Sequence, residues 1–244
     1  MKKKLLNVLC WFVPSARWRH KIRKLAKYAK PQNNIIEIVK TNGQRIRVKR
    51  VRGCTFKFSG DNNHIVLCEP LGKLTLDVNV TSSVYIELGA SAGNQRKISV
   101  HKRGGVDIVN RLIVGDGLWT TNFMTVEFCN GVSDILIGKE CLFAAGIVFR
   151  TGDYHTILDV NTGAVLNHNK NICIGNHVWI ADACMLLKGA AVADNTIVGA
   201  RSLVNKPFEQ TNVIIAGVPA RVVKENVNWD RRPPYQYATD NGLI

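Results

Sequence analysis

The sequence contains no C-x-x-C pair, no G-x-S-x-G motif and no apolar run of about 18 residues. Its seven cysteines are odd in number and lack metal-ligand spacing, so we expect a reducing compartment without disulfides or a zinc ribbon. No membrane span is expected, and a serine hydrolase has no support. The stretch from Leu5 to Val13 lacks an A-x-A-like cleavage site, which argues against a signal peptide. The cytoplasm is the expected location.

A repeat with a period of six is the clearest positive feature of the sequence. Aliphatic or aromatic residues hold every sixth place in two runs, with mostly small residues directly behind them: Ile137, Phe143 and Phe149, then Ile174, Ile180, Leu186, Val192, Val198 and Val204. A period of six matches neither a helix nor a simple strand alternation. It suits coils of three short strands that stack their repeated side chains inward. We therefore predict an all-β solenoid, with a β-sandwich of accidental spacing as the alternative.

The repeat has one large interruption. Phe149 and Ile174 are 25 residues apart, which is not a multiple of six. The residues between them, over 156–171, are rich in Asn, Asp, Thr and Gly and predict a loop extruded from the solenoid. Loops on a rigid scaffold commonly carry binding groups.

Three segments are expected along the chain: a basic helical or capping N-terminus over 1–58, a β-helix over 59–206 and a C-terminal extension over 207–244. Within the β-helix, alternating apolar and polar residues from about residue 60 to Phe128 predict earlier, less regular coils. An irregular tail is expected at Pro233 and Pro234.

The formal net charge of +15 is largely a property of the first segment. Residues 1–30 hold ten lysines and arginines and no acid, and their apolar residues share a helical face. A basic amphipathic helix fits peripheral contact with an anionic membrane, while capping of the open solenoid end explains the segment equally well. No nucleic-acid motif accompanies the charge, so nucleic acid is not an expected partner.

Five motifs accompany the repeat, at residues 150–155 (RTGDYH), 174–180 (IGNHVWI), 187–189 (LKG), 198–206 (VGARSLVNK) and 216–221 (AGVPAR). With them the chain resembles the hexapeptide-repeat acyltransferases, in the sugar and polysaccharide O-acetyltransferase branch. The resemblance implies a left-handed parallel β-helix, a homotrimer with active sites between subunits, and acetyl-coenzyme A as co-substrate without a metal. The implied acceptor is a sugar hydroxyl of a surface polysaccharide or of its lipid-linked precursor.

His155 is the expected catalytic base. It precedes the extruded loop and lies 24 positions before Trp179, as the histidine and tryptophan of that family do. A hydroxyl is a poor nucleophile at neutral pH, and an imidazole can take its proton and return it to a leaving thiolate. Asp153 lies on the same side of an extended chain, where it either orients the imidazole or belongs to a turn.

The resemblance also assigns a coenzyme A site to Trp179, Ala181, Ala200, Lys206 and Arg221. Small side chains let the pantetheine arm lie against a coil, and cations suit its phosphates. The chain departs from the family at Ala181–Asp182, where Gly-Ser or Gly-Gly is common, so a backbone N–H would have to hold the oxyanion. Arg201 replaces a usual Gly and Asn205 a usual Thr.

Three other functions remain open from the sequence. An amino-sugar N-acetyltransferase would share the fold and the co-substrate. A non-catalytic β-helix that binds glycans would share the fold alone. The six histidines could instead form a metal site between subunits, as in β-helix carbonic anhydrases, but they lack ligand spacing, so no metal is expected.

Overall fold

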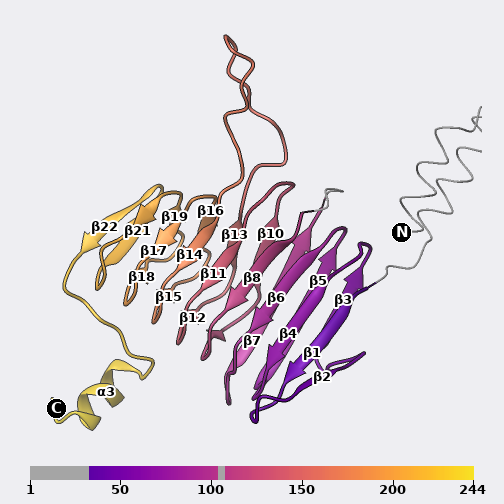
Figure 1. The fold of residues 1–244 in the computed structure, drawn as a ribbon. Helices are drawn as coiled ribbons and strands as arrows, with labels where there is room; N and C mark the ends of the chain where they lie inside the picture. Colours follow the sequence, from indigo (N-terminus) through magenta and orange to yellow (C-terminus); the bar gives the residue numbers. More distant parts are fainter. Residues whose placement is uncertain (1–32, 104–107) are drawn as a thin grey trace, which may run out of the picture. The chain divides into compact units, whose positions relative to one another are not determined.

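The computed structural model describes residues 33–103 and 108–244 (Figure 1). The helix expected within 1–30, with its membrane or capping role, lies outside the described residues. The regular structure of the described part of the chain consists of short strands and one helix, α3 (Pro234–Asp240), near the C-terminus.

Three sheets contain the strands of the described residues. The first sheet has the order β2 (Arg45–Arg47), β1 (Ile35–Val39), β4 (His64–Cys68), β6 (Val84–Leu88), β8 (Asn110–Val114), β11 (Ile135–Ile137), β14 (Ile172–Ile174), β17 (Ala191–Val192), β20 (Pro207–Phe208). The second has the order β19 (Leu203–Val204), β16 (Met185–Leu187), β13 (Ile147–Arg150), β10 (Met124–Phe128), β7 (Gln95–Lys102), β5 (Lys73–Val80), β3 (Cys54–Phe58). The third has the order β22 (Ala220–Lys224), β21 (Ile214–Gly217), β18 (Ile197–Val198), β15 (Trp179–Ile180), β12 (Leu142–Phe143), β9 (Trp119–Thr120).

From β8 onward successive strands visit the three sheets in turn, so the chain winds around a three-sided prism, whereas the strands from β3 to β8 alternate between the second and the first sheet. From β11 onward each coil passes through the first, the third and then the second sheet. Neighbouring coils pair in parallel, and the antiparallel pairs of the described strands are the hairpins β1–β2 and β21–β22. Figure 1 shows the strands stacked along the prism axis. The predicted fold class, a left-handed parallel β-helix, is confirmed.

Side chains at the six-residue positions fill the prism. All nine of these residues are buried, with at most 4% of their surface exposed. They stack from coil to coil: Phe149 pairs with Leu186, and Ile180 with Val198. Complete burial of one aliphatic side chain contributes about 1.5–3 kcal/mol to the free energy of folding. The stacking of these side chains from coil to coil is therefore the main term that stabilises the β-helix.

The limits of the β-helix differ from the expected residues 59 and 206. Strands β1 and β3 lie before residue 59, yet β1 pairs in parallel with β4 and β3 with β5. Strands β20 and β21 lie after residue 206 and continue the first and the third sheet. The early coils escaped the six-residue pattern because their strands are longer, with eight residues in β5 and in β7.

The tail is also more ordered than expected. Helix α3 starts at Pro234, where a proline's fixed φ and missing N–H cost nothing. The expectation of an irregular tail at Pro233 and Pro234 was therefore wrong for the seven residues of α3.

Replacing Leu186 by Ala should destabilise the protein by about 2–5 kcal/mol, because it leaves a cavity in the stacked core. Leu187→Ala is the matched control, since Leu187 is next along β16 and points outward with a half-buried side chain. Its expected cost is about 1 kcal/mol or less. Urea unfolding of both variants measures the difference, and equal losses would contradict the inward register.

Candidate active site

A long loop leaves the prism at the corner between the second and the first sheet. It runs between Arg150, the end of β13, and Ile172, the start of β14, and it stands clear of the strands (Figure 1). Its outer part is a small hairpin, with a bridge between Leu158 and Val165. The loop therefore begins before residue 156, and both Asp153 and His155 belong to its base.

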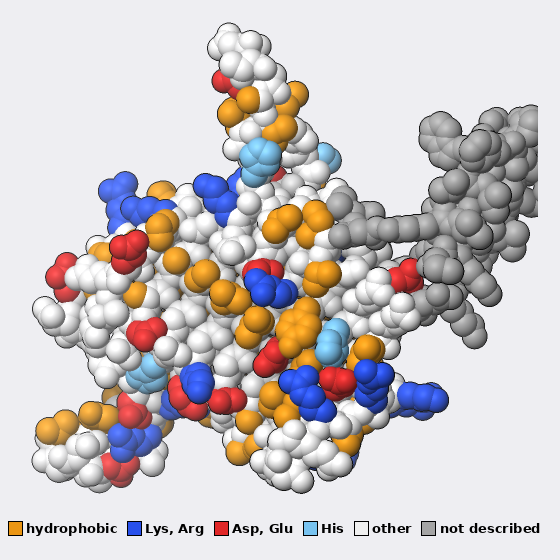
Figure 2. All heavy atoms as spheres, in the orientation of Figure 1, with side chains coloured by type: hydrophobic (Ala, Val, Ile, Leu, Met, Phe, Trp, Pro, Cys, Tyr) orange, Lys and Arg blue, Asp and Glu red, His pale blue; other side chains and the backbone are white. Residues whose placement is uncertain are grey.

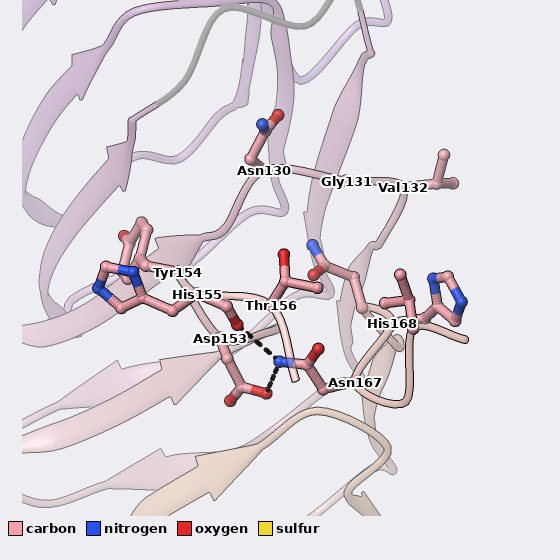
Figure 3. Close-up of a pocket in the computed structure, with 11 residues that line it drawn as sticks. Asn130, Gly131, Val132, Asp153, Tyr154, His155, Thr156, Asn167 and His168 are labelled. Carbon is pink, nitrogen blue, oxygen red and sulfur yellow. Dashed lines mark hydrogen bonds between the residues drawn. The ribbon is translucent and has the colours of Figure 1, made fainter. Parts of the chain in front are cut away.

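The base of the loop encloses a hollow of about 380 Å³. Its lining comes from the loop and from the turn after β10, and includes Asn130, Tyr154, His155, Asn167 and His168. Figure 3 shows His155 and His168 on opposite sides of this hollow, with Thr156 between them. The hollow is open, and its polar side chains offer hydrogen-bond partners that could orient a ligand such as a sugar.

His155 is exposed, and its ring makes no hydrogen bond to any of the described residues. Its backbone carbonyl is held by the side-chain N–H of Asn167 at 2.8 Å, so the main chain is fixed while the ring is left available. A free imidazole in an open hollow can accept a proton from a bound hydroxyl.

Asp153 is not a partner of the His155 ring. Its Oδ2 accepts hydrogen bonds from Lys188 Nζ at 2.5 Å and from Asn167 Nδ2 at 2.9 Å. The hydrogen bond from Lys188, followed by that from Asn167, holds the pKa of the Asp153 carboxyl below its usual value. Asn167 thus links Asp153 to the His155 main chain (Figure 3), and the aspartate fixes the loop base instead of orienting the imidazole.

Trp179 lies elsewhere on the same chain. It is on β15 of the third sheet, and the residues that line the His155 hollow do not include it. Its ring centroid is 6.1 Å from that of Trp229. The two tryptophans line a second hollow of about 460 Å³ with Asp230, Arg232 and Tyr237 of the C-terminal segment.

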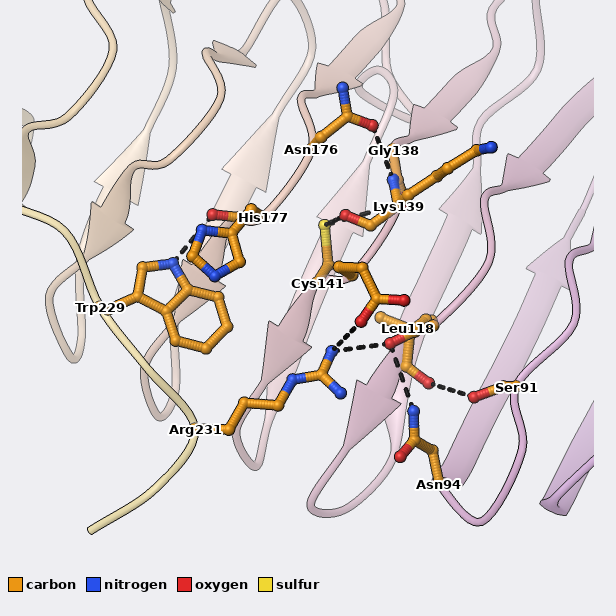
Figure 4. A network of polar contacts seen from close by, with 12 residues as sticks. Ser91, Asn94, Leu118, Gly138, Lys139, Cys141, Asn176, His177, Trp229 and Arg231 are labelled. Atoms are coloured by element: carbon orange, nitrogen blue, oxygen red, sulfur yellow. Dashed lines mark hydrogen bonds and ion pairs between the residues drawn. The ribbon is translucent and has the colours of Figure 1, made fainter. Parts of the chain in front are cut away.

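The C-terminal segment is held against the coils by side chains from distant positions. Trp229 is buried, stacks on His177 with centroids 4.3 Å apart and donates from Nε1 to the His177 carbonyl at 2.8 Å (Figure 4). Arg231 donates to the carbonyl of Gly117 at 2.8 Å and pairs with Glu140 at 3.2 Å. These contacts place Trp229 over the outward face of the third sheet, beside Trp179.

Lys206 and Arg221 are brought together by the structure. Both line a hollow of about 440 Å³ at the last coils, together with Asn205, Phe208 and Pro219. Both cations are exposed, and neither forms an ion pair with any of the described residues. Lys206 Nζ lies 5.4 Å from the centre of the Phe208 ring. This combination suits a phosphate group beside an apolar or aromatic moiety.

Ala181 and Ala200 lie at the corner that follows the third sheet, one coil apart. The backbone N–H of Ala181 donates to the carbonyl of Val198 at 2.9 Å. That N–H is therefore committed to the ladder between coils and is not free to hold an oxyanion. Arg201 has φ of 59°, the left-handed conformation that glycine adopts at least cost, which accounts for the glycine common at this corner in the family.

Three residues with clear structural roles were not assigned from the sequence. Lys188 lay inside one of the quoted motifs, but its ion pair with Asp153 spans 35 positions. Asn167 lay in the polar loop, where nothing in the surrounding sequence set it apart from the other polar residues. Trp229 lay in the C-terminal extension, where no repeat predicts its contact with Trp179 and His177.

Residues 33–103 and 108–244 contain no group of three His, Cys, Asp or Glu side chains placed to hold a metal ion. Within the same residues, no helix has the length and apolar character that crossing a membrane would require.

Comparisons with known proteins relate the chain to enzymes of one kind. It is 42% identical over 98 residues to a polysialic acid O-acetyltransferase of Neisseria meningitidis, which covers 40% of this chain and 46% of that protein. It is 41% identical over 121 residues to a putative colanic acid biosynthesis acetyltransferase of Escherichia coli, covering 49% of this chain and 62% of the other. Over less than half of its length, the chain is thus similar to bacterial polysaccharide O-acetyltransferases. The resemblance seen in the motifs is confirmed.

The fold agrees with this relationship. The crystal structure of the polysialic acid-specific acetyltransferase NeuO matches 88% of this chain and 96% of its own, with a TM-score of 0.58 and 17% identity. No family model matches the sequence. The chain spans about half the length of the curated relatives it matches first.

Replacing Lys188 by Met should raise the pKa of Asp153 toward its usual value of 3.8, because the largest cause of the shift is removed. In the wild type the ion pair stabilises the folded protein fully at pH values above the pKa that Asp153 has in the unfolded chain. This stabilisation is lost as the pH falls through the lower pKa that Asp153 has in the folded protein. Carboxyl NMR titration measures the change. Lys170→Met is the control on the same loop, and an Asp153 titration that Lys188→Met leaves unchanged would refute the pairing.

Proposed function

We propose that the protein transfers an acetyl group from acetyl-coenzyme A to a sugar hydroxyl of a surface polysaccharide or its lipid-linked precursor. The observation that carries this proposal is the free imidazole of His155 in an open polar hollow, at the base of a loop extruded from an acetyltransferase-type β-helix. The names of the sequence relatives support the acceptor class. A screen of acetyl-coenzyme A consumption with purified bacterial surface glycans tests it, and no turnover with any of them would count against it.

The chemistry requires one proton to move out and back. His155 takes the proton of the acceptor hydroxyl as the oxygen attacks the thioester carbonyl. The carbon–sulfur bond then breaks, and the imidazolium returns the proton to the leaving thiolate. The products are an O-acetyl sugar and free coenzyme A, and no covalent enzyme intermediate forms.

Acetyl-coenzyme A fits the residues at the last coils. Lys206 and Arg221 would bind its phosphates, since their charges have no partner among the described residues and they share one hollow. Ala181 and Ala200 would leave room for the pantetheine arm along the corner. Trp179 would lie beside the thioester, as the family resemblance implies.

We propose a homotrimer, because one chain does not place Trp179 beside His155. The two residues lie on different sides of the prism, so a site containing both needs a neighbouring copy. A row of hydrophobic side chains crosses the outward face of the first sheet and offers an apolar contact surface (Figure 2). The cytoplasm is the proposed location, consistent with six described cysteines that are all free.

His155→Ala should lower the turnover of acetyl transfer by a factor on the order of 10², because the hydroxyl then lacks a base. His168→Ala is the matched control, since His168 lines the same hollow from its other side and is expected to keep near-normal turnover. Steady-state kinetics with a single acceptor measures both. Near-normal turnover of the His155 variant would remove it from the mechanism.

The double variant Lys206→Gln/Arg221→Gln should raise the KM for acetyl-coenzyme A by about tenfold, because two charge-assisted contacts to phosphate are lost. The kcat and the KM for the acceptor should stay close to the wild-type values. Initial-rate kinetics over both substrates separates these effects. An unchanged KM for acetyl-coenzyme A would show that the cofactor phosphates bind elsewhere.

A further inference from the structure

A further groove, separate from the three hollows described above, lies on the first coils. It has a volume of about 660 Å³ and is bounded by residues 50–53, by residues 71–75 and by the start of β7. We name it the basic groove and define it by its four cations, Arg50, Arg52, Lys73 and Lys97. At this level of the prism the third sheet has no strand, since its first strand is β9, and the groove is lined mainly by loop residues 50–53 and 71–72 together with the first residues of β5 and β7.

The charge of the basic groove is not compensated. No acidic residue lines it, and none of its four cations forms an ion pair with any of the described residues. Nearby cations behave differently: Arg45 and Arg47 both pair with Glu37, at 3.5 and 3.3 Å. Four like charges around one concavity focus a positive potential that attracts anions.

A buried cation supports the groove from inside the prism. Arg96 is only 1% exposed, and its guanidinium donates to the carbonyls of Leu71 and Gly89, both at 2.6 Å. Leu71 is part of the groove wall. Arg96 has no carboxylate partner among the described residues, and its Nε has no hydrogen-bond partner. Its charge therefore adds to the positive potential at this wall, where the surroundings are of low dielectric.

The groove wall is closely packed at two glycines. A Cβ at Gly53 would lie 2.4 Å from the carbonyl oxygen of Leu74, and a Cβ at Gly72 would lie 2.3 Å from that of Ser91. Both glycines also have positive φ. The groove is thus preformed, which lowers the entropic cost of binding a ligand.

The lining chemistry selects among anionic ligands. Val51, Leu71 and Leu74 give the groove an apolar floor, on which the C–H faces of sugar rings can pack. No aromatic side chain lines it, whereas sites for single-stranded nucleic acid use aromatic stacking platforms. A concave surface also suits a polymer segment better than a flat bilayer. Arginine pairs with a carboxylate through two parallel hydrogen bonds, so a sugar acid fits well.

We propose that the basic groove binds an anionic segment of the polysaccharide, several sugars away from the residue that is acetylated. This inference rests on the proposed function and narrows its acceptor to a polymer that carries carboxylates. The groove strands β7, β5 and β3 lie in the same sheet as β13, two to four strands away, which is roughly 10–20 Å along the axis. The groove is at the start of these strands and His155 follows the end of β13, so a long chain can contact both.

Two binding sites on one polymer raise the effective concentration of the acceptor at His155. The groove should therefore lower the KM for a long anionic polysaccharide without changing kcat. It should have no effect on a short neutral acceptor, which cannot reach it.

The test uses the full chain and polygalacturonate as a probe with one carboxylate per sugar, at low ionic strength and without acetyl-coenzyme A. The variants Lys73→Gln/Lys97→Gln and Arg50→Gln/Arg52→Gln should each bind the probe about tenfold more weakly than the wild type, since charge-assisted contacts are lost. Lys139→Gln/Lys224→Gln removes the same charge from exposed positions outside the groove and should bind as the wild type does. Thermal unfolding confirms that every variant is folded.

Equal probe binding by the groove variants and the control variant would overturn the proposal. The proposal would also be overturned if the groove bound single-stranded DNA or phosphatidylglycerol vesicles more tightly than polygalacturonate, or bound neutral dextran as tightly as polygalacturonate. Binding is measured without catalysis, so it can succeed where acetyl transfer fails. Conversely, if the protein acetylates polysaccharides while its groove variants bind polygalacturonate as tightly as the wild type does, the groove proposal is refuted and the proposed function stands.

Discussion

The stacking of inward side chains from one coil onto the next sets the position of the other groups on the described coils. Each repeated residue is buried against its equivalents in the neighbouring coils, and the parallel ladders allow one register only. A slip by one residue would turn the whole apolar set outward, so the register is strongly determined. The corners of the prism are then fixed as well, and one of them carries the base of the extruded loop with His155.

The extruded loop shows how an insertion is accommodated without loss of that register. Strand β13 pairs with β16 beyond the loop as it pairs with β10 before it. The loop leaves and returns at a corner, so neither ladder is interrupted. It is anchored by Asn167 and Lys188 through Asp153, and this anchor holds the main chain of His155 while its ring faces the hollow. A rigid scaffold with a free imidazole is the arrangement that proton transfer needs.

The sequence was informative where the pattern is periodic and local. Side chains repeat every sixth residue from Ile137 to Phe149 and again from Ile174 to Val204, so these coils, the loop between the two runs and the place of His155 beside it could be predicted. The first coils could not, because strands such as β5 and β7 alternate with a period of two and resemble ordinary strands. The ion pair of Asp153 and the contact of Trp179 with Trp229 depend on segments 35 and 50 positions apart, which only the fold brings together. The basic groove likewise combines three coils, and its cations are dispersed along the chain.

The proposed reaction requires a sugar oxygen as the acceptor and the described hollow as its site. The most direct measurement is mass spectrometry and NMR of a purified anionic surface polysaccharide after incubation with the protein and acetyl-coenzyme A. We predict one acetyl group attached through oxygen, removed by mild base and formed far more slowly by the His155→Ala variant. An acetyl group that survives mild base as an amide, or equal formation by the variant, would contradict the account.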